Sequence, residues 1–413
     1  MAKQHPADRE ADRVLAIQRE LAPRTRRGDI VLIALCSLFI LIFAVGIYCI
    51  PHRSFSEVEN SSLQTFPRVS SSGKFLDRVW DGRFMAELKD FYTDQFPLRD
   101  SLVATKAKAE LLLGKSENNG VIPGKDGYLI KRIEYSEAQL AQLQENLDAV
   151  TAFRDKTDLP VTFAIAPRAV DVLDRYFPAL YDNTRADAVW NLIDIYAAEQ
   201  PLLSLREPLR ACVDAGKAVW YRTDHHWTTL GAYYAYTQYA AAAGLTPHTL
   251  DQFERVEYPG FLGTYYSSSG ITSLAANPDT VIAYRPMGTN KMKMTMPDGT
   301  VYDWYVVNDV SDYASSVKYG CFAGGDQPYN EVENPAITDG SACLVIKDSY
   351  GNAFIPFLVD HYQYLYWVDF RYYKGSIYDL VEQKGIRDVV VVQNIYNTAA
   401  EGTLSSLQAL IER

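Results

Sequence analysis

An uninterrupted apolar stretch near the start of the chain limits what this protein can fold into. It runs from Ile30 to Ile50, reads IVLIALCSLFILIFAVGIYCI and contains no charged residue. As a helix it is long enough to cross a hydrocarbon core of about 30 Å. The arginines that closely precede it are Arg19, Arg24, Arg26 and Arg27. Basic residues favour the cytoplasmic side, and the following CIPHRSF is a poor cleavage site. We therefore expect an uncleaved single-pass anchor in the cell membrane, with a cytoplasmic N-terminus and an extracytoplasmic C-terminal domain.

Changes in composition along the chain predict its domain boundaries. Residues 1–28 are a charged segment that we expect to be an irregular cytoplasmic tail, and residues 29–50 form the anchor. Residues 51–75 are rich in Ser, Pro and Asn, which is typical of a linker. In residues 76–413, continuous apolar runs alternate with helical segments, which predicts an α/β domain with a parallel sheet flanked by helices. Gly, Thr, Tyr and Asn dominate residues 254–340, where we expect a β-rich insertion.

The overall charge and the cysteines exclude some classes of protein. The net charge is -11 and no basic stripe is present, so we expect no nucleic-acid partner. The chain has 5 Cys and no CxxC spacing. Three of them lie beyond the apolar stretch, an odd number that does not make a disulfide framework.

The stretch TDHHW contains the first candidate active-site residues. Asp224 and His226 are two positions apart, and in an extended segment such residues point to the same side. The carboxylate could then fix the tautomer of the imidazole, as in a serine hydrolase triad. His225 would point away from the pair. The alternative is a polar cap, with satisfied histidines, at the start of the helix that follows.

A second candidate lies in VIKDSYGNAF. Ser349 follows a predicted buried strand and precedes a predicted helix, and ligands of open α/β sheets bind at that edge. A serine in this position is exposed as a nucleophile, and backbone N–H groups at the helix start can hold an oxyanion. The alternative is that Ser349 serves only as a helix cap.

The motifs TDHHWT, KDSYGNAF and VDFRYY, in this order, resemble the DHHW family of bacterial envelope proteins. The resemblance extends to FYTDQFPLRD, GKDGYLI, AIAPR and GFLGTYYSSSG. That family resembles the SGNH-like O-acetyltransferases of polysaccharides, such as the alginate type. The resemblance implies an SGNH-hydrolase-like fold with Asp224 and His226 as acid and base and Ser349 as nucleophile. Lys347 stands where those enzymes have the Gly of Gly-Asp-Ser.

Three further residues are candidates for binding the oxyanion or the substrate. Arg371, in VDFRYY, follows a strand and could bind an anionic or carbonyl oxygen, or else form a surface ion pair. Asn394 ends the last predicted strand and could donate to the oxyanion, or else occupy a turn. Trp227 could stack on a sugar ring, or else pack in the interior.

A metal site is an alternative for the histidine pair. Asp224, His225 and His226 could bind zinc with further ligands, but adjacent side chains of an extended segment point to opposite faces. We therefore expect no metal and no other cofactor.

The function we expect is that of a membrane-anchored O-acyltransferase, of the O-acetyl type, or an acetylesterase. Its substrate would be a cell-envelope or secreted polysaccharide. The acyl donor could be delivered by a membrane acyltransferase. The alternative is a non-catalytic glycan-binding scaffold of an envelope modification or export complex.

Overall fold

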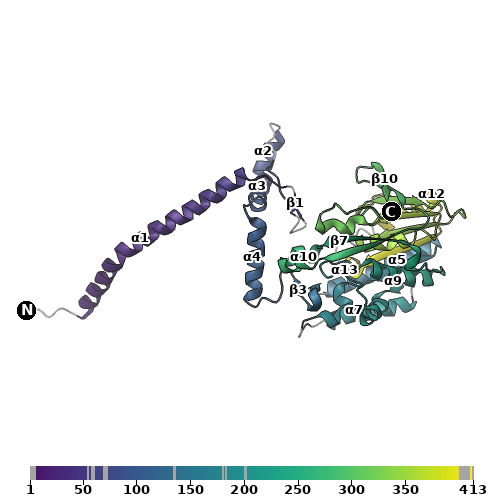
Figure 1. The fold of residues 1–413 in the computed structure, drawn as a ribbon, viewed down its shortest axis with the longest axis horizontal. Helices are drawn as coiled ribbons and strands as arrows, with labels where there is room; N and C mark the ends of the chain where they lie inside the picture. Colours follow the sequence, from purple (N-terminus) through teal and green to yellow (C-terminus); the bar gives the residue numbers. More distant parts are fainter. Residues whose placement is uncertain are drawn as a thin grey trace, which may run out of the picture. The chain divides into compact units, whose positions relative to one another are not determined.

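The structure is a computed structural model. It describes residues 6–53, 55–56, 61–67, 73–133, 136–178, 181, 184–199, 202–399 and 410–411. The chain divides into two compact units (Figure 1). The first comprises Met1–Ser56 and Ser61–Val103, and the second comprises Glu57–Asn60 and Ala104–Arg413.

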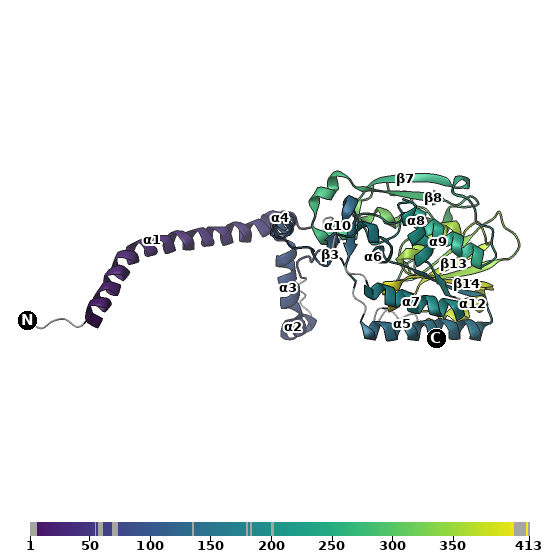
Figure 2. The same cartoon turned by 90° about the horizontal axis from the view of Figure 1, so that it is seen from below.

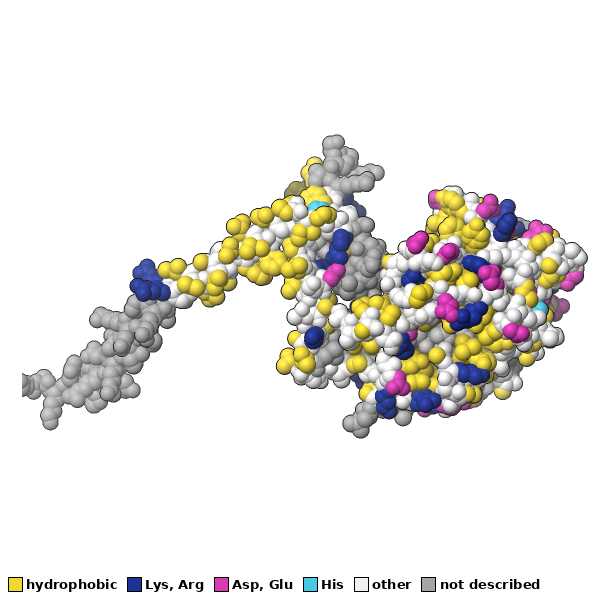
Figure 3. Space-filling view, in the orientation of Figure 1, with side chains coloured by type: hydrophobic (Ala, Val, Ile, Leu, Met, Phe, Trp, Pro, Cys, Tyr) yellow, Lys and Arg dark blue, Asp and Glu magenta, His cyan; other side chains and the backbone are white. Residues whose placement is uncertain are grey.

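Helices make up most of the first unit. Its elements are α1 (Pro6–Cys49), β1 (Phe55–Ser56), β2 (Ser61–Ser62), α2 (Gly73–Trp80), α3 (Arg83–Asp94) and the start of α4 (Arg99–Leu112). Among the described residues, one helix is long and apolar enough to cross a membrane, the part of α1 from Arg26 to Cys49. Hydrophobic side chains cover this part of α1 (Figure 3). Residues 6–28 are helical rather than irregular, because α1 begins upstream of the apolar stretch.

The second unit is built on one eight-stranded sheet. Its strands are β5 (Val161–Ala166), β6 (Leu202–Ser204), β9 (Lys291–Thr295), β10 (Val301–Tyr305), β11 (Tyr329–Glu333), β12 (Ala342–Lys347), β13 (Tyr364–Asp369) and β14 (Asp388–Asn394). Their order is β10-β9-β11-β13-β12-β14-β5-β6. The five strands from β13 to β6 are parallel, and β11, β9 and β10 are joined to them and to one another by antiparallel pairings. The last strand in the sequence therefore lies inside the parallel part of the sheet.

Helices cover both faces of the parallel strands (Figure 2). The helices on one face are α5 (Glu137–Thr157), α7 (Thr184–Glu199) and α12 (Ile377–Lys384). Those on the other face are α8 (Arg206–Asp214), α9 (Thr229–Ala242) and α11 (Ser349–Phe354). Alternate residues of β12 enter the two cores, with Val345 in one and Ile346 in the other. This double burial explains why the parallel strands have continuous apolar sequences.

The segment from 254 to 340 holds β7 (Glu254–Phe261), α10 (Thr264–Ser269), β8 (Asp279–Arg285) and β9 to β11. β7 and β8 form a separate two-stranded antiparallel sheet, and β9 to β11 extend the main sheet. The unit that carries the sheet begins at Ala104, not at residue 76, because α2 and α3 belong to the first unit. The remaining short elements are β3 (Val121–Pro123), β4 (Leu129–Lys131), α6 (Ala169–Val172) and α13 (Ile395–Ala399).

Candidate active site

The TDHHW stretch folds as a bend rather than as an extended strand. Asp279, at the start of β8, holds this bend from the side. Its Oδ2 accepts hydrogen bonds from the Thr223 N–H (2.9 Å) and hydroxyl (2.7 Å). Its Oδ1 accepts one from Nε of Arg222 at 2.9 Å. The insertion thus fixes the backbone that carries the two histidines.

Three of the candidate side chains form a continuous hydrogen-bonded chain. Nδ1 of His226 lies 2.6 Å from Oδ1 of Asp224, and Nε2 of His226 lies 2.9 Å from Oγ of Ser349. Asp224 and His226 are buried, whereas Ser349 is half-buried. Ser349 is the first residue of α11, and the residue that caps this helix is Asp348, whose side chain accepts from the Tyr350 N–H. The hydroxyl of Ser349 is therefore not used as a cap.

Both oxygens of Asp224 are occupied by donors. Oδ1 also accepts from the His226 N–H at 2.9 Å, and Oδ2 accepts from the Thr264 N–H (2.8 Å) and hydroxyl (3.1 Å). A Cβ at Gly263 would lie 2.2 Å from Oδ2 of Asp224, so this close approach requires glycine. Burial alone would raise the pKa of the Asp224 carboxyl, but His225, His226 and these hydrogen bonds outweigh it. The pKa is held well below its usual range, and Asp224 stays ionised.

The imidazole of His226 lies between two other rings. The ring of His225 is 3.7 Å away, centroid to centroid, and that of Tyr319 is stacked on it at 3.9 Å with an interplanar angle of 11°. The Tyr319 hydroxyl donates to the carbonyl oxygen of Ser349 at 3.1 Å. Tyr319 thus touches both the base and the residue that carries the hydroxyl.

The prediction that His225 points away from the pair is wrong. It assumed an extended chain, and the bend at this point turns both imidazoles to the same side. Nδ1 of His225 lies 2.7 Å from the Thr264 hydroxyl. Burial, and then the neighbouring His226, lower the pKa of His225 to about 3. His225 is therefore neutral at physiological pH.

The bend also changes the argument about a metal. Ligand atoms of Asp224, His225 and His226 lie within 4.8 Å of one another, and three protein ligands are enough for a catalytic zinc. However, Asp224 and His226 are already hydrogen-bonded to each other. A metal ion at these atoms would displace the hydrogen bond that orients the His226 ring.

Lys347 does not crowd the turn before Ser349. Its side chain is fully buried and passes Gly351, where a Cβ would lie 2.5 Å from the Cβ of Lys347. Its Nζ lies 3.0 Å from the Gly325 carbonyl oxygen and 3.2 Å from Oδ2 of Asp369. The ammonium group thus lies in a buried cluster of charges with Asp326 and Asp369.

Arg371 belongs to the same charged cluster. Its guanidinium contacts Asp369 at 2.5 Å and Asp326 at 2.9 Å. Asp326 in turn accepts from Nδ2 of Asn352, on α11, at 2.9 Å. Arg371 follows a strand, as expected, and its Nε and Nη2 are bound to these carboxylates, so it takes part in a partly buried ion pair.

The two other candidates are also committed to structural contacts. Asn394 donates from Nδ2 to Oδ2 of Asp348 at 2.6 Å and from its N–H to the same atom at 2.9 Å. It fixes the residue that caps α11 rather than facing the Ser349 hydroxyl. Trp227 is completely buried and donates to the Tyr350 carbonyl oxygen at 3.0 Å, so no face of its ring is open to a sugar.

The sequence analysis missed Thr264, Tyr319 and Asp326, which the insertion contributes to the site. Thr264 lies in GFLGTYYSSSG, so the motif was visible but the contact to Asp224 was not. Tyr319 and Asp326 have no local signal, because they reach the site only through the folding of the insertion onto the sheet. Arg168 of AIAPR, after β5, lies in the same region and donates to the Tyr265 hydroxyl at 3.1 Å.

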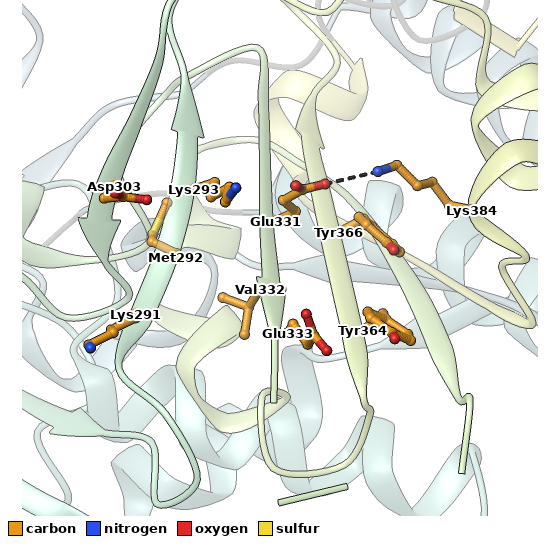
Figure 4. Close-up of a pocket in the computed structure, with 10 residues that line it drawn as sticks. All are labelled: Lys291, Met292, Lys293, Asp303, Glu331, Val332, Glu333, Tyr364, Tyr366 and Lys384. Carbon is orange, nitrogen blue, oxygen red and sulfur yellow. Dashed lines mark hydrogen bonds and ion pairs between the residues drawn. The ribbon is translucent and has the colours of Figure 1, made fainter. Parts of the chain in front are cut away.

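A separate cavity of about 380 Å³ lies over β9, β11 and β13 (Figure 4). Glu331 and Lys384 form an ion pair of 3.0 Å on one side of it. Tyr364 and Tyr366 line it from β13. Neither Asp224, His226 nor Ser349 lines this cavity, so it is distinct from the candidate active site.

Comparisons with known proteins find similar sequences over parts of the chain. Residues 207–368 match the DHHW protein family, and residues 121–275 match the SGNH hydrolase-like domain of the acetyltransferase AlgX. A probable alginate O-acetylase AlgJ from Pseudomonas syringae pv. tomato is 28% identical over 192 residues, which are 44% of this chain and 47% of that protein. The chain thus spans about half the length of this relative.

Solved structures share the fold. A DHHW family protein from Eubacterium siraeum superposes with a TM-score of 0.59 at 24% identity, over 71% of this chain and 96% of that one. PatB1 from Bacillus cereus superposes with a TM-score of 0.57 at 18% identity, over 69% of this chain and 96% of that one. Residues 207–368 are therefore similar to the DHHW proteins and residues 121–275 to the SGNH hydrolase-like domain of AlgX. The solved DHHW protein shares its fold with 71% of this chain.

Proposed function

We propose that this protein transfers acyl groups, of the acetyl type, to or from a polysaccharide through Ser349, His226 and Asp224. The observation that carries the proposal is the pair of hydrogen bonds on His226, 2.6 Å to Asp224 and 2.9 Å to Ser349. A nucleophile, a base and an orienting carboxylate within hydrogen-bond reach are the requirements for nucleophilic acyl transfer. The polysaccharide substrate is proposed by analogy with the probable alginate O-acetylase.

The first half of the reaction forms an acyl-serine. Nε2 of His226 takes the proton of Ser349 Oγ as Oγ attacks the carbonyl carbon of the acyl donor. The bond to the leaving group then breaks, and the imidazolium of His226 returns the proton to that group. In the second half, His226 deprotonates a sugar hydroxyl, which attacks the acyl-serine and releases Ser349. Water in place of the sugar makes the protein an esterase.

The residues around the imidazole support this cycle. Ionised Asp224 keeps the proton of His226 on Nδ1, so that Nε2 faces Ser349 as an acceptor, and it stabilises the imidazolium that forms. Neutral His225 adds no positive charge beside that imidazolium. The Ser349 N–H is the first of α11 and has no acceptor within the helix, so it can donate to the oxyanion. The Tyr350 and Gly351 N–H groups are bonded to Asp348.

The test is the turnover of a chromogenic acetyl ester by the full chain in detergent, together with the mass of the Ser349 peptide after quenching. Ser349→Ala and His226→Ala should each lower kcat by at least a factor on the order of 10³, and the double variant should be little worse, because residues that act as a unit are not additive. The matched control is His248→Ala, a histidine outside the site, which should retain turnover. Wild-type protein that neither turns over nor becomes acylated would leave the glycan-binding scaffold as the function.

Membrane anchoring by α1 and an extracytoplasmic sheet unit are part of this proposal. The apolar part of α1, Arg26–Cys49, is long enough to span a bilayer, and the arginines before it favour a cytoplasmic N-terminus.

A further inference from the structure

The last turns of α1 are packed against the end of α3 and the residues after it. The rings of Phe43 and Phe96 are stacked with centroids 4.6 Å apart and an interplanar angle of 7°. Pro97 lies on Gly46, where an added Cβ would be 2.8 Å from the proline ring. Such an approach requires a residue without a side chain. The segment that follows α3 is thus seated directly on the apolar helix.

These contacts set the depth of that segment relative to the apolar stretch. Phe43 is six positions and Gly46 three positions before Cys49. At a rise of 1.5 Å per residue, they lie about 9 Å and about 5 Å before the end of α1. If the apolar stretch of α1 ends at the outer boundary of the hydrocarbon layer, Phe96 and Pro97 therefore lie close to that boundary, next to the headgroup layer.

The residues next to Pro97 present apolar side chains outward. Leu98 is 69% exposed and Leu102 is 47% exposed. Leu98 also has a φ of 59°, which is rare for a residue other than glycine and signals a functional constraint. A strained backbone that holds an apolar side chain outward, near the end of the membrane-spanning helix, favours a surface that contacts lipid.

α2 and α3 also expose apolar side chains. α3 runs across the direction of the last turns of α1 (Figure 2), as a helix lying along a membrane surface would. Tyr92 of α3 faces α1, with 2.8 Å between its hydroxyl and that of Tyr48. Met85, two turns earlier on the same face, is 59% exposed. On α2, Leu76 and Trp80, four positions apart on one face, are 59% and 86% exposed.

We propose that Leu76, Trp80, Met85, Leu98 and Leu102 form an interfacial surface that is inserted into the lipid headgroup layer on the extracytoplasmic side. Apolar side chains and an exposed tryptophan on short helices are typical of segments that lie in this layer. The membrane-spanning helix would hold the first unit along the bilayer normal, and the interfacial surface would hold it along the bilayer plane. This inference rests on α1 being a membrane-spanning anchor and not on the proposed chemistry.

Fluorescence quenching in liposomes tests the proposal with the full chain. The buried tryptophans are Trp190, Trp220, Trp227 and Trp367. Lipids brominated near the headgroup should quench wild-type emission more than lipids brominated near the chain end, and Trp80→Phe should remove most of that quenching. In the Trp80→Phe background, Leu98→Trp should restore it. The matched control is Tyr302→Trp in the same background, on β10 of the other unit, at a residue that is 50% exposed.

The control should be quenched by aqueous iodide and not by brominated lipid. Equal lipid quenching of wild type and Trp80→Phe would overturn the proposal, as would a Leu98→Trp emission that iodide quenches as strongly as the control. Protection of both positions from iodide and from brominated lipid would mean that a protein covers the surface instead.

Two further measurements distinguish a failure of this inference from a failure of the proposed function. Alkaline extraction should leave the chain in the membrane, and protease added to intact cells should digest the C-terminal mass and spare the N-terminus. Release by alkali, or a mature chain that begins after Ile50, would remove the anchor and the inference with it. Trp80→Phe and Leu98→Trp should leave ester turnover unchanged, because neither residue lies in the active site.

Discussion

Replacing Asp224 with asparagine should expose how the carboxylate works, because every group around it is a donor. Oδ1 faces the N–H and Nδ1 of His226, and Oδ2 faces the N–H and hydroxyl of Thr264. Whichever way the amide of the asparagine turns, its NH₂ meets a backbone N–H. We therefore expect a loss of about 1–3 kcal/mol in the free energy of unfolding, the usual cost of an unsatisfied buried polar group.

We expect Asp224→Asn to lower kcat by more than its effect on the free energy of unfolding would explain. An NH₂ group towards His226 would place the imidazole proton on Nε2, and the base could not accept the proton of Ser349. That tautomer error costs on the order of 10⁴ in kcat in a serine protease, or about 5 kcal/mol of transition-state stabilisation. An NH₂ group towards Thr264 would keep the tautomer and remove only the charge. We expect kcat to fall by between about 10² and about 10⁴.

Asp279→Asn is the matched control. Asp279 is also buried and also accepts from a backbone N–H in the same bend, but it does not touch the imidazole. Its replacement should cost a similar free energy of unfolding by urea titration and less than about tenfold in ester turnover. The reasoning is refuted if Asp224→Asn stays within tenfold of the wild type, or if Asp279→Asn loses as much turnover as Asp224→Asn.

Two further predictions concern stability. The free energy of unfolding should fall as the pH drops from 6.5 towards 3, because His225 takes a proton in that range when unfolded, whereas in the fold, buried beside His226, its pKa is about 3. The slope due to this group, at most about 1.4 kcal/mol per pH unit, should be absent in urea titrations of His225→Gln; equal slopes would contradict the pKa. Lys347→Met should cost about 3–5 kcal/mol, because it leaves the buried carboxylate of Asp369 without one of its cations. The exposed Lys291→Met should change stability by less than about 0.5 kcal/mol, and equal costs would show that the charged cluster does not hold the fold.

Much of the fold followed from local patterns. The apolar runs of β12 and β14 are buried on both faces, so their sequences alone predicted parallel strands, and the structure confirms them. Ser136 caps α5 by accepting from the Gln139 N–H at 3.2 Å, a contact between residues that are close together in the sequence. The start of α11 directly after β12 placed Ser349 at the edge of the sheet.

The rest of the site depends on contacts that no local pattern encodes. Residues two positions apart on a strand point to the same side, and this rule correctly predicted that Asp224 and His226 face each other. The same rule wrongly predicted that His225 points away, because a bend held by Asp279 replaces the strand. Tyr319 stacks on an imidazole far away in the sequence, in a segment where tyrosine is common. The position of the Lys347 side chain could not be predicted from the sequence, because it depends on carboxylate partners in other segments of the chain.

The place of β14 has a consequence for how the protein is made. β14 is the link between β12 on one side and β5 on the other, so before it is added the sheet is two separate pieces with open edges. The ribosome must therefore complete the chain through Asn394 before either piece can close. Until then, both pieces have unpaired backbone groups at their edges that invite association with other chains. Loss of its last strand would produce an aggregate rather than a smaller working domain.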